Sequence, residues 1–129
     1  MNVLLDTHTL LWLISQPTTL DPEVVGQLAE PATSVWVSAA SAWEIAIKTR
    51  LGRLKGETLL ATWAIQLNAM RVDDLPIDSE DAILAGRLPW DHRDPFDRLI
   101  VAQALRRNLT VATRDTKILA AALTPTLKV

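Results

Sequence analysis

Cysteine is absent from this 129-residue chain, and glycine is scarce, with four residues dispersed along it. The lack of cysteine excludes disulfide bonds and thiolate metal sites, and it favours a reducing, cytoplasmic compartment. Four scattered glycines also provide no glycine-rich loop for binding phosphate groups. The two histidines, His8 and His92, are too few and too far apart in the sequence for a typical zinc site.

Long apolar runs and a basic amino-terminal segment are also missing. No run approaches the roughly 20 residues that a membrane-spanning helix needs. The opening residues MNVLLD reach an acid at position 6 without the features of a secretory signal. We therefore expect a soluble protein with no membrane partner. The length and the 49% hydrophobic content predict one globular domain over residues 1–129.

An excess of positive charge is absent as well, because the formal net charge is −2. Proteins that bind nucleic acid over a broad surface are normally basic, since they must neutralise many phosphates. A nucleic-acid partner would therefore need a local basic patch or bound metal ions on this chain.

Short apolar segments alternate with helical patterns along the whole chain. Strands are predicted over residues 2–5, 34–37, 71–75, 109–112 and 126–129. Helices are predicted over residues 7–14, 22–30, 39–51, 58–70, 79–88, 95–107 and 116–123. This alternation predicts an α/β fold, a three-layer α/β/α sandwich with a mainly parallel sheet. In such folds ligands bind beyond the carboxyl ends of the strands.

Two acids follow predicted strands directly. Asp6 ends the first strand, and Asp115 comes after the strand 109–112. Each of them has a purely structural explanation, because an aspartate is a common cap for the helix that begins at the next residue. Each also stands where an α/β fold places its ligands, so both explanations remain open for these two residues.

Two more acids lie on apolar helices. Glu44 can pair with Lys48 one turn later, an interaction of about 0.3 kcal/mol on an exposed face. Asp94 is an N-cap ahead of Pro95, and Asp97 is three residues further on, at the start of a helix that is apolar almost all round. We expect Asp97 to point from the end of this buried helix into a cleft.

The joint pattern of Asp6, Glu44, Asp97 and Asp115 points to a metal site. Four converging carboxylates would repel one another without a cation. With hard divalent cations they form the oxygen-rich environment that Mg²⁺ or Mn²⁺ prefers. No nucleophile-elbow sequence supports a serine hydrolase instead.

Four ordered stretches are distinctive along the chain: DTHTLLWL (6–13), VSAASAWEIAIKTRLGRL (37–54), HRDPFDRLIVAQA (92–104) and LTVATRD (109–115). Together they resemble the VapC toxins of the PIN-domain family. The resemblance covers essentially the whole chain and implies a single PIN domain. It further implies a metal-dependent endoribonuclease that hydrolyses RNA phosphodiester bonds, using Mg²⁺ or Mn²⁺. The implied partners are an RNA substrate, a cognate antitoxin of a type II toxin–antitoxin pair and a second copy of the chain in a homodimer.

The resemblance also assigns roles to individual residues. The catalytic and metal-binding residues it implies are Asp6, Glu44, Asp97 and Asp115. Residues expected to support these carboxylates are Thr7, Asp94 and Thr113. Contacts to the substrate are expected from Lys48, Arg50, Arg93, Arg98 and Arg114. For Lys48 and Arg50, a solvated helix end favoured by the helix dipole is an equally good explanation.

Three alternatives remain at this point: a metal-dependent DNA nuclease, another phosphoesterase, and a non-catalytic PIN-like binding module. A haloacid-dehalogenase-like phosphatase needs an acid two residues after its nucleophile, where this chain has His8. A receiver-like domain needs a paired acid near Asp6 and a lysine after a later strand, and neither is evident. A binding module would lack one or more of the four acids, and all four are present. The choice between RNA and DNA is not decided by these residues.

Five tryptophans are an unusual number for this length. We expect Trp43 to pack in the core. Trp12 and Trp63 suit either the core or an interface with another subunit or an antitoxin, where aromatic residues are enriched.

Overall fold

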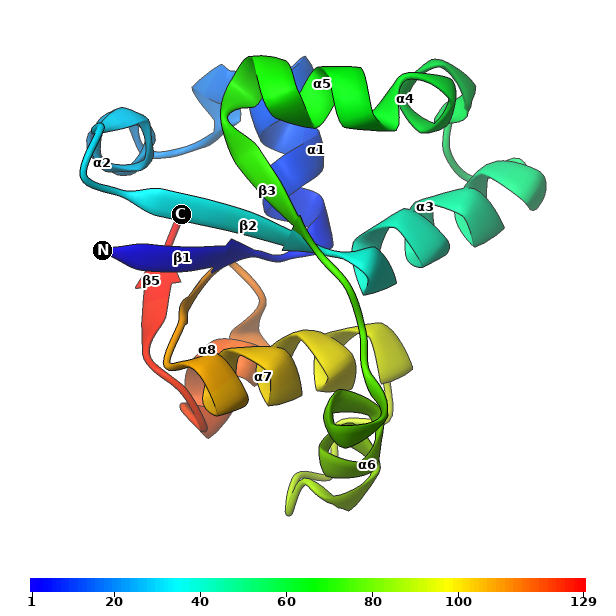
Figure 1. Ribbon diagram of the computed structural model, residues 1–129, viewed down its shortest axis with the longest axis vertical. Coiled ribbons are helices and arrows are strands. Elements are labelled where there is room, and N and C mark those ends of the chain that lie inside the picture. The colour runs from blue at the N-terminus through cyan, green and yellow to red at the C-terminus, as the bar shows by residue number, and fades with distance from the viewer.

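A five-stranded parallel sheet forms the centre of the molecule in the computed structural model, which describes residues 1–129 (Figure 1). The strand order is β3-β2-β1-β4-β5, and every neighbouring pair is parallel. The strands are β1 (Asn2–Leu5), β2 (Ser34–Ser38), β3 (Val72–Leu75), β4 (Thr110–Thr113) and β5 (Thr126–Lys128). The first strand is thus central, and the order reverses on either side of it.

Helices cover both faces of this sheet. One layer contains α1 (Thr7–Ser15), the 3₁₀ turn η1 (Pro17–Thr19), α2 (Pro22–Ala29), α3 (Ala39–Arg50), α4 (Glu57–Ala61) and α5 (Trp63–Met70). The opposite layer contains α6 (Ser79–Arg87), α7 (Pro95–Arg107) and α8 (Thr116–Ala121). The three-layer α/β/α sandwich with a parallel sheet is therefore confirmed.

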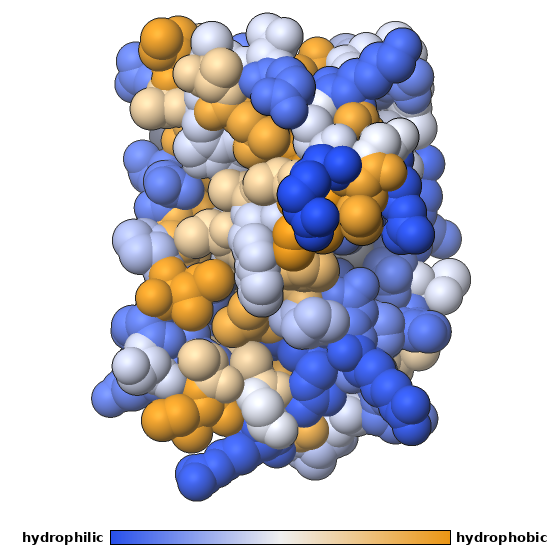
Figure 2. All heavy atoms as spheres, turned by 90° about the vertical axis from the view of Figure 1, so that its right-hand side faces the viewer, coloured by the Kyte–Doolittle hydropathy of each residue, from blue (hydrophilic) through white to orange (hydrophobic).

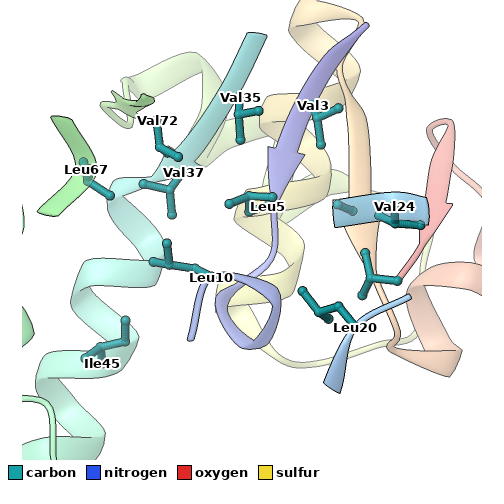
Figure 3. Packing of buried hydrophobic residues seen from close by; sticks show 12 residues of the cluster. Val3, Leu5, Leu10, Leu20, Val24, Val35, Val37, Ile45, Leu67 and Val72 are labelled. Atoms are coloured by element: carbon teal, nitrogen blue, oxygen red, sulfur yellow. The ribbon is translucent and has the colours of Figure 1, made fainter. Parts of the chain in front are cut away.

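Two hydrophobic clusters lie on the two faces of the sheet. Val3 and Leu5 of β1 point into the first cluster, together with Leu10 of α1 (Figure 3). Leu4, between them in sequence, belongs to the second cluster, where Ile100 of α7 packs. Successive side chains of a strand point to opposite faces, so a central strand covered on both faces must be apolar throughout. This explains the apolar run Val3–Leu5, which follows the exposed Asn2 at the start of β1.

Most element boundaries match the prediction within one or two residues, with one clear exception. The single helix predicted over 58–70 is two helices, α4 and α5, which meet at Thr62. The Thr62 hydroxyl donates to the carbonyl oxygen of Thr58, and its backbone leaves the helical region. Such bonding back to the preceding turn is known to disturb helices.

The carboxyl ends of β1, β2 and β4 lie at one edge of the sheet, because β1 pairs in parallel with both neighbours. Figure 1 shows β1 and β2 ending at this edge, toward the right. Helices α1 and α3 begin directly after β1 and β2, and α7 brings its amino-terminal end to the same edge. Figure 2 shows this side of the molecule, on which hydrophilic and hydrophobic side chains are intermingled. No helix in the structure is both long and apolar enough to span a membrane.

The prediction that Trp43 packs in the core is wrong. Its side chain is 52% exposed, and its ring meets the edge of Phe96 with the centroids 4.9 Å apart. Trp43 lies one residue before the buried Glu44, so it is turned roughly 100° around the helix and away from the sheet. Trp12 and Trp63 are partly buried against the first hydrophobic cluster.

Candidate metal-binding and catalytic site

Asp6 lies between the end of β1 and the start of α1, and its carboxylate is held from two directions. Oδ1 accepts a hydrogen bond from the backbone N–H of Thr9 at 2.9 Å, which caps α1. Oδ2 accepts one from the hydroxyl of Thr113 at 2.5 Å. The helix-capping explanation and the functional one are therefore compatible, because the cap fixes the carboxylate at the carboxyl edge of the sheet.

Thr113 joins Asp6 to Asp115. Its hydroxyl oxygen donates to Asp6 and accepts the backbone N–H of Asp115 at 2.9 Å. The Asp115 carboxylate caps α8, since its Oδ1 accepts the backbone N–H groups of Lys117 and Ile118. The register that pairs Leu5 with Ala112 brings the ends of β1 and β4 side by side and makes this link possible.

Glu44 reaches the same region from α3 and is almost fully buried. Lys48, one turn later, donates to its Oε2 at 2.6 Å. The hydroxyl groups of Thr7 and Ser41 lie 2.9 Å apart and connect α1 to α3 one turn before Glu44. Thr7 was expected to orient a carboxylate directly, but its hydroxyl instead bonds this neighbouring serine.

Asp97 lies in the first turn of α7, whose amino-terminal end is capped by Asp94. Oδ1 of Asp94 accepts the backbone N–H groups of Phe96 and Asp97, as the sequence predicts for an N-cap. Burial raises the pKa of the Asp97 carboxyl from its ordinary 3.8 to about 6, against the lowering effect of the His92 hydrogen bond. The negative charges of Asp94 and Asp115 add to the rise in pKa.

His92 is a component of the site that the sequence argument does not include. Its Nε2 lies 2.7 Å from Oδ2 of Asp97. His92, Asp94 and Asp97 each offer a ligand atom, and these atoms all lie within 4.8 Å of one another. The sequence does contain a signal for this role, because His92 stands in the HRDPFDR stretch, five residues before Asp97. At the level of sequence the two histidines are weighed only as zinc ligands.

Arg98 has a structural role. Its guanidinium group donates to the backbone carbonyl oxygens of Ala85, Leu88, Trp90 and His92 at 2.7–3.1 Å. Four donors bound to backbone carbonyls hold the segment 88–92, and with it the imidazole of His92. We therefore do not retain Arg98 as a contact to the substrate.

Of the other predicted substrate contacts, some side chains already have partners within the chain and others have none. The guanidinium of Arg114 donates to the carbonyl oxygens of Val129 and Thr19 and lies over the ring of Trp12, 4.8 Å from its centroid. We do not retain Arg114 as a substrate contact either. Lys48 is paired with Glu44, whereas Arg50 and Arg93 are exposed and have no hydrogen-bond or ion-pair partner.

Each of three carboxylates keeps one oxygen without a hydrogen-bond partner. Every hydrogen bond that these three carboxylates receive goes to a single oxygen, which is Oε2 of Glu44, Oδ2 of Asp97 or Oδ1 of Asp115. Their second oxygens accept none from the chain. Carboxylates that are oriented through one oxygen and open at the other match the ligand chemistry of hard divalent cations.

Residues 3–123 match the sequence profile of the PIN domain. The chain is also similar to ribonuclease VapC22 of Mycobacterium tuberculosis (strain ATCC 25618 / H37Rv), with 32% identity over 118 residues, which cover 91% of this chain and 89% of the relative.

Three solved structures share the fold. VapBC2 from Rickettsia felis, bound to a DNA fragment from its promoter, matches with a TM-score of 0.71 and 17% identity over 98% of both chains. VapBC-1 from nontypeable Haemophilus influenzae matches with a TM-score of 0.69 and 21% identity over 99% of this chain and 98% of that one. A toxin–antitoxin complex from Klebsiella pneumoniae matches with a TM-score of 0.67 and 15% identity over 98% and 96%.

Proposed function

The chain belongs to the PIN-domain family of VapC ribonuclease toxins, and from this premise we propose that it hydrolyses RNA with Mg²⁺ or Mn²⁺ bound by Asp6, Glu44, Asp97 and Asp115. Family membership makes the chain a ribonuclease toxin of a type II toxin–antitoxin system. The ion and the residues that bind it are our proposal. The observation that carries it is the set of three carboxylates, those of Glu44, Asp97 and Asp115, that each have one oxygen without a hydrogen-bond partner. Asp6 completes the proposed set from the end of β1, where each of its oxygens accepts one hydrogen bond.

The donor set fits a hard divalent cation. All four proposed ligands are carboxylates, which Mg²⁺ and Mn²⁺ favour over the thiolate ligands that this chain lacks. The raised pKa of Asp97 indicates that its negative charge is poorly compensated in the protein alone. A bound cation would supply that compensation and favour the ionised carboxylate.

When bound, the ion would neutralise charge on the scissile phosphate and lower the pKa of a water molecule. The chain supplies the orientation of the groups around it. Thr9 and Thr113 hold the carboxylate of Asp6, and His92 holds that of Asp97. We infer that Asp115, through the oxygen that accepts no hydrogen bond from the chain, would accept a proton from the attacking water.

Lys48 limits the charge that accumulates near Glu44. Its ammonium group lies 2.6 Å from Oε2, so one oxygen of the carboxylate is paired before any cation arrives. The exposed side chains of Arg50 and Arg93 are unpaired and are the contacts to the RNA backbone that we retain. A local set of cations of this kind suits RNA binding despite the net charge of −2.

We also propose an antitoxin partner and a homodimer, with the whole chain acting as one PIN domain. The proposal of an antitoxin is supported by the similarity in fold to the Klebsiella pneumoniae toxin–antitoxin complex. The exposed Trp43, packed edge-on against Phe96 between α3 and α7, provides an aromatic surface beside the site, of the sort enriched in protein interfaces.

The test is cleavage of a mixed pool of structured RNAs in Mg²⁺, in Mn²⁺ and in EDTA. We expect cleavage in at least one of the metals and none in EDTA. Asp97→Asn should abolish it, while Asp73→Asn, which neutralises an exposed acid on β3, should leave it unchanged. A matching single-stranded DNA pool distinguishes the two nucleic acids. Full cleavage by the Asp97 variant would contradict the proposed site.

A further inference from the structure

A hollow of about 820 Å³ lies between the segment 90–94 and α8, and one of its lining residues, His92, contacts the proposed ligand Asp97. We propose that it binds one nucleotide of the RNA adjacent to the scissile phosphate. In this arrangement Trp90 contacts the base, and Arg93 and Lys117 contact phosphate oxygens. This inference rests on the proposed function and adds to it a defined subsite for the substrate.

The hollow shares its wall with the site. His92 and Asp94 line it, and His92 lies 2.7 Å from Asp97 on the other side. Lys117 lines it from α8, and the backbone N–H of this residue is bound by the Asp115 carboxylate. A strand of RNA whose phosphate lies at the carboxylates would therefore place its neighbouring nucleotide here.

The charges of the hollow suit a phosphate group. Arg93 and Lys117 are both exposed, and neither has an ion-pair or hydrogen-bond partner. The negative charge of Asp94 is partly compensated, since its Oδ1 accepts two backbone N–H groups at the start of α7. Asp91 is exposed and unpaired, and a carboxylate in that position can accept hydrogen bonds from the amino group of a base.

Trp90 gives the hollow an aromatic wall in a fixed position. Its indole ring meets the imidazole of His92 edge-on, with the centroids 4.8 Å apart. Its backbone carbonyl accepts a hydrogen bond from Arg98 at 2.7 Å. The indole is partly buried against the second hydrophobic cluster, and its remaining surface lines the hollow as an aromatic wall of the kind on which bases of single-stranded nucleic acids stack irrespective of sequence.

The size and composition of the hollow favour a nucleotide over other ligands. Its volume falls within the range of about 300–1,000 Å³ that is usual for ligand sites. An apolar ligand would not match two free cations and a carboxylate, and a lone phosphate would not use the tryptophan. A phosphate, a sugar and a base together would use all of these groups.

Nuclear magnetic resonance offers a direct test, because each of the five tryptophans gives its own indole N–H signal. We would titrate adenosine 5′-monophosphate into the ¹⁵N-labelled wild-type chain in Mg²⁺. The Trp90 signal, identified by its absence in Trp90→Phe, should shift and saturate. Arg93→Ala and Lys117→Ala should each weaken this binding at least about tenfold, the effect of losing one hydrogen bond to a charged group.

A matched control and a kinetic arm complete the experiment. Arg71→Asn removes one positive charge at the opposite edge of the sheet, where the left-handed backbone (φ 56°) suits asparagine, and it should change nothing.

In RNA cleavage, Arg93→Ala and Lys117→Ala should raise KM and leave kcat near that of the wild type. If the wild type cleaves RNA but the Trp90 signal stays still and both variants keep the wild-type KM, the inference is overturned and the proposed function stands. Absence of cleavage by the wild type would count against the proposed function, and the inference would fall with it.

Discussion

The imidazole Nε2 of His92 lies 2.7 Å from Oδ2 of Asp97 and leaves Oδ1 of that carboxylate without a hydrogen-bond partner. The imidazole is itself held by the edge of the Trp90 ring and by Arg98, which binds the His92 backbone carbonyl at 3.1 Å. His92 thus orients the proposed metal ligand Asp97, and Trp90 and Arg98 in turn hold His92. In the proposed site His92 would act on the metal through Asp97, as a positioning residue.

His92→Ala should weaken metal binding about 10- to 100-fold, as is typical when the group that orients a ligand is lost. Isothermal titration of Mn²⁺ measures this directly. His92→Gln, which keeps an N–H donor, should recover part of the affinity. His8→Ala removes the other, exposed histidine and provides the control. A His92→Ala variant with wild-type affinity would remove His92 from the site.

The stability of the metal-free protein should depend on pH through Asp97. The pKa of its carboxyl is about 6 in the folded chain, against an ordinary value of 3.8. Between pH 3.8 and pH 6 the folded chain therefore keeps a proton on Asp97 that the unfolded chain has released. Stability contributed by this proton is fully present below about pH 3.8 and is lost as the pH rises through 6. A difference of about two in pKa corresponds to at most about 3 kcal/mol.

Urea unfolding in EDTA at pH 4.5 and pH 7 tests this dependence. The wild type should lose more stability between the two pH values than Asp97→Asn, which has no carboxyl group to ionise. Adding Mg²⁺ at pH 7 should restore the wild type, because the cation compensates the ionised carboxylate. An identical pH response of the two proteins would show that Asp97 does not have the raised pKa.

Thr113→Val should weaken metal binding while the chain stays folded. Valine has the same shape, but it removes both the donor to Oδ2 of Asp6 and the acceptor of the Asp115 N–H. Two proposed ligands then lose their common support, and we expect the Kd for Mn²⁺ to rise at least about tenfold. Thr113→Ser keeps the hydroxyl and should restore the affinity. Equal affinities of the valine and serine variants would exclude this role of the hydroxyl.

Arg98→Lys should lower the free energy of unfolding by about 2–3 kcal/mol, even though it keeps the positive charge. Lysine cannot reproduce the planar donor set that binds four backbone carbonyls, and carbonyls left without a donor in a partly buried place are costly. Arg93→Lys is the control and should stay within about 0.5 kcal/mol of the wild type. Full stability of the Arg98 variant combined with weaker RNA binding would instead support the contact to the substrate that the sequence suggested.

A second charged network, remote from the site, joins α6 to α7. The side chain of Asp81 is fully buried and accepts hydrogen bonds from Gln103, Arg106 and Arg107. Burial on its own raises the pKa of this carboxyl, but the hydrogen bonds from the two arginines outweigh it and hold the pKa well below the usual range. This network lies at the end of α7 opposite Asp97.

Asp81→Ala should therefore destabilise the protein by about 3–5 kcal/mol, the usual cost of removing one member of a buried ion pair. Thermal unfolding measures the loss. Glu80→Ala removes an exposed partner of Arg106 and should cost less than about 1 kcal/mol. The affinity for Mn²⁺ of the folded Asp81 variant should equal that of the wild type. A change in that affinity would indicate that the network supports the site.

The layers of the fold and the positions of the four acids could be predicted from local patterns. A strand covered on both faces is apolar throughout, so residues 2–5 and 34–37 indicate a buried parallel sheet, and Asp6 and Asp115 follow strands whose ends share one edge. Asp94 before Pro95 and the left-handed Asn108 mark the two ends of α7 in the same local way. The break at Thr62 could not be predicted, because the apolar pattern continues across it.

The sequence by itself thus determined the α/β sandwich, the family resemblance and which carboxylates are candidates, since these depend on spacing within single elements. Only the tertiary structure decided which partner each polar side chain has. Thr113 reaches Asp6 across 107 residues, Arg98 binds the carbonyls of the preceding segment, and Trp43 points outward. A side chain with several possible partners takes the one that packing brings within hydrogen-bond distance, and packing depends on the register of strands and helices far apart in the chain.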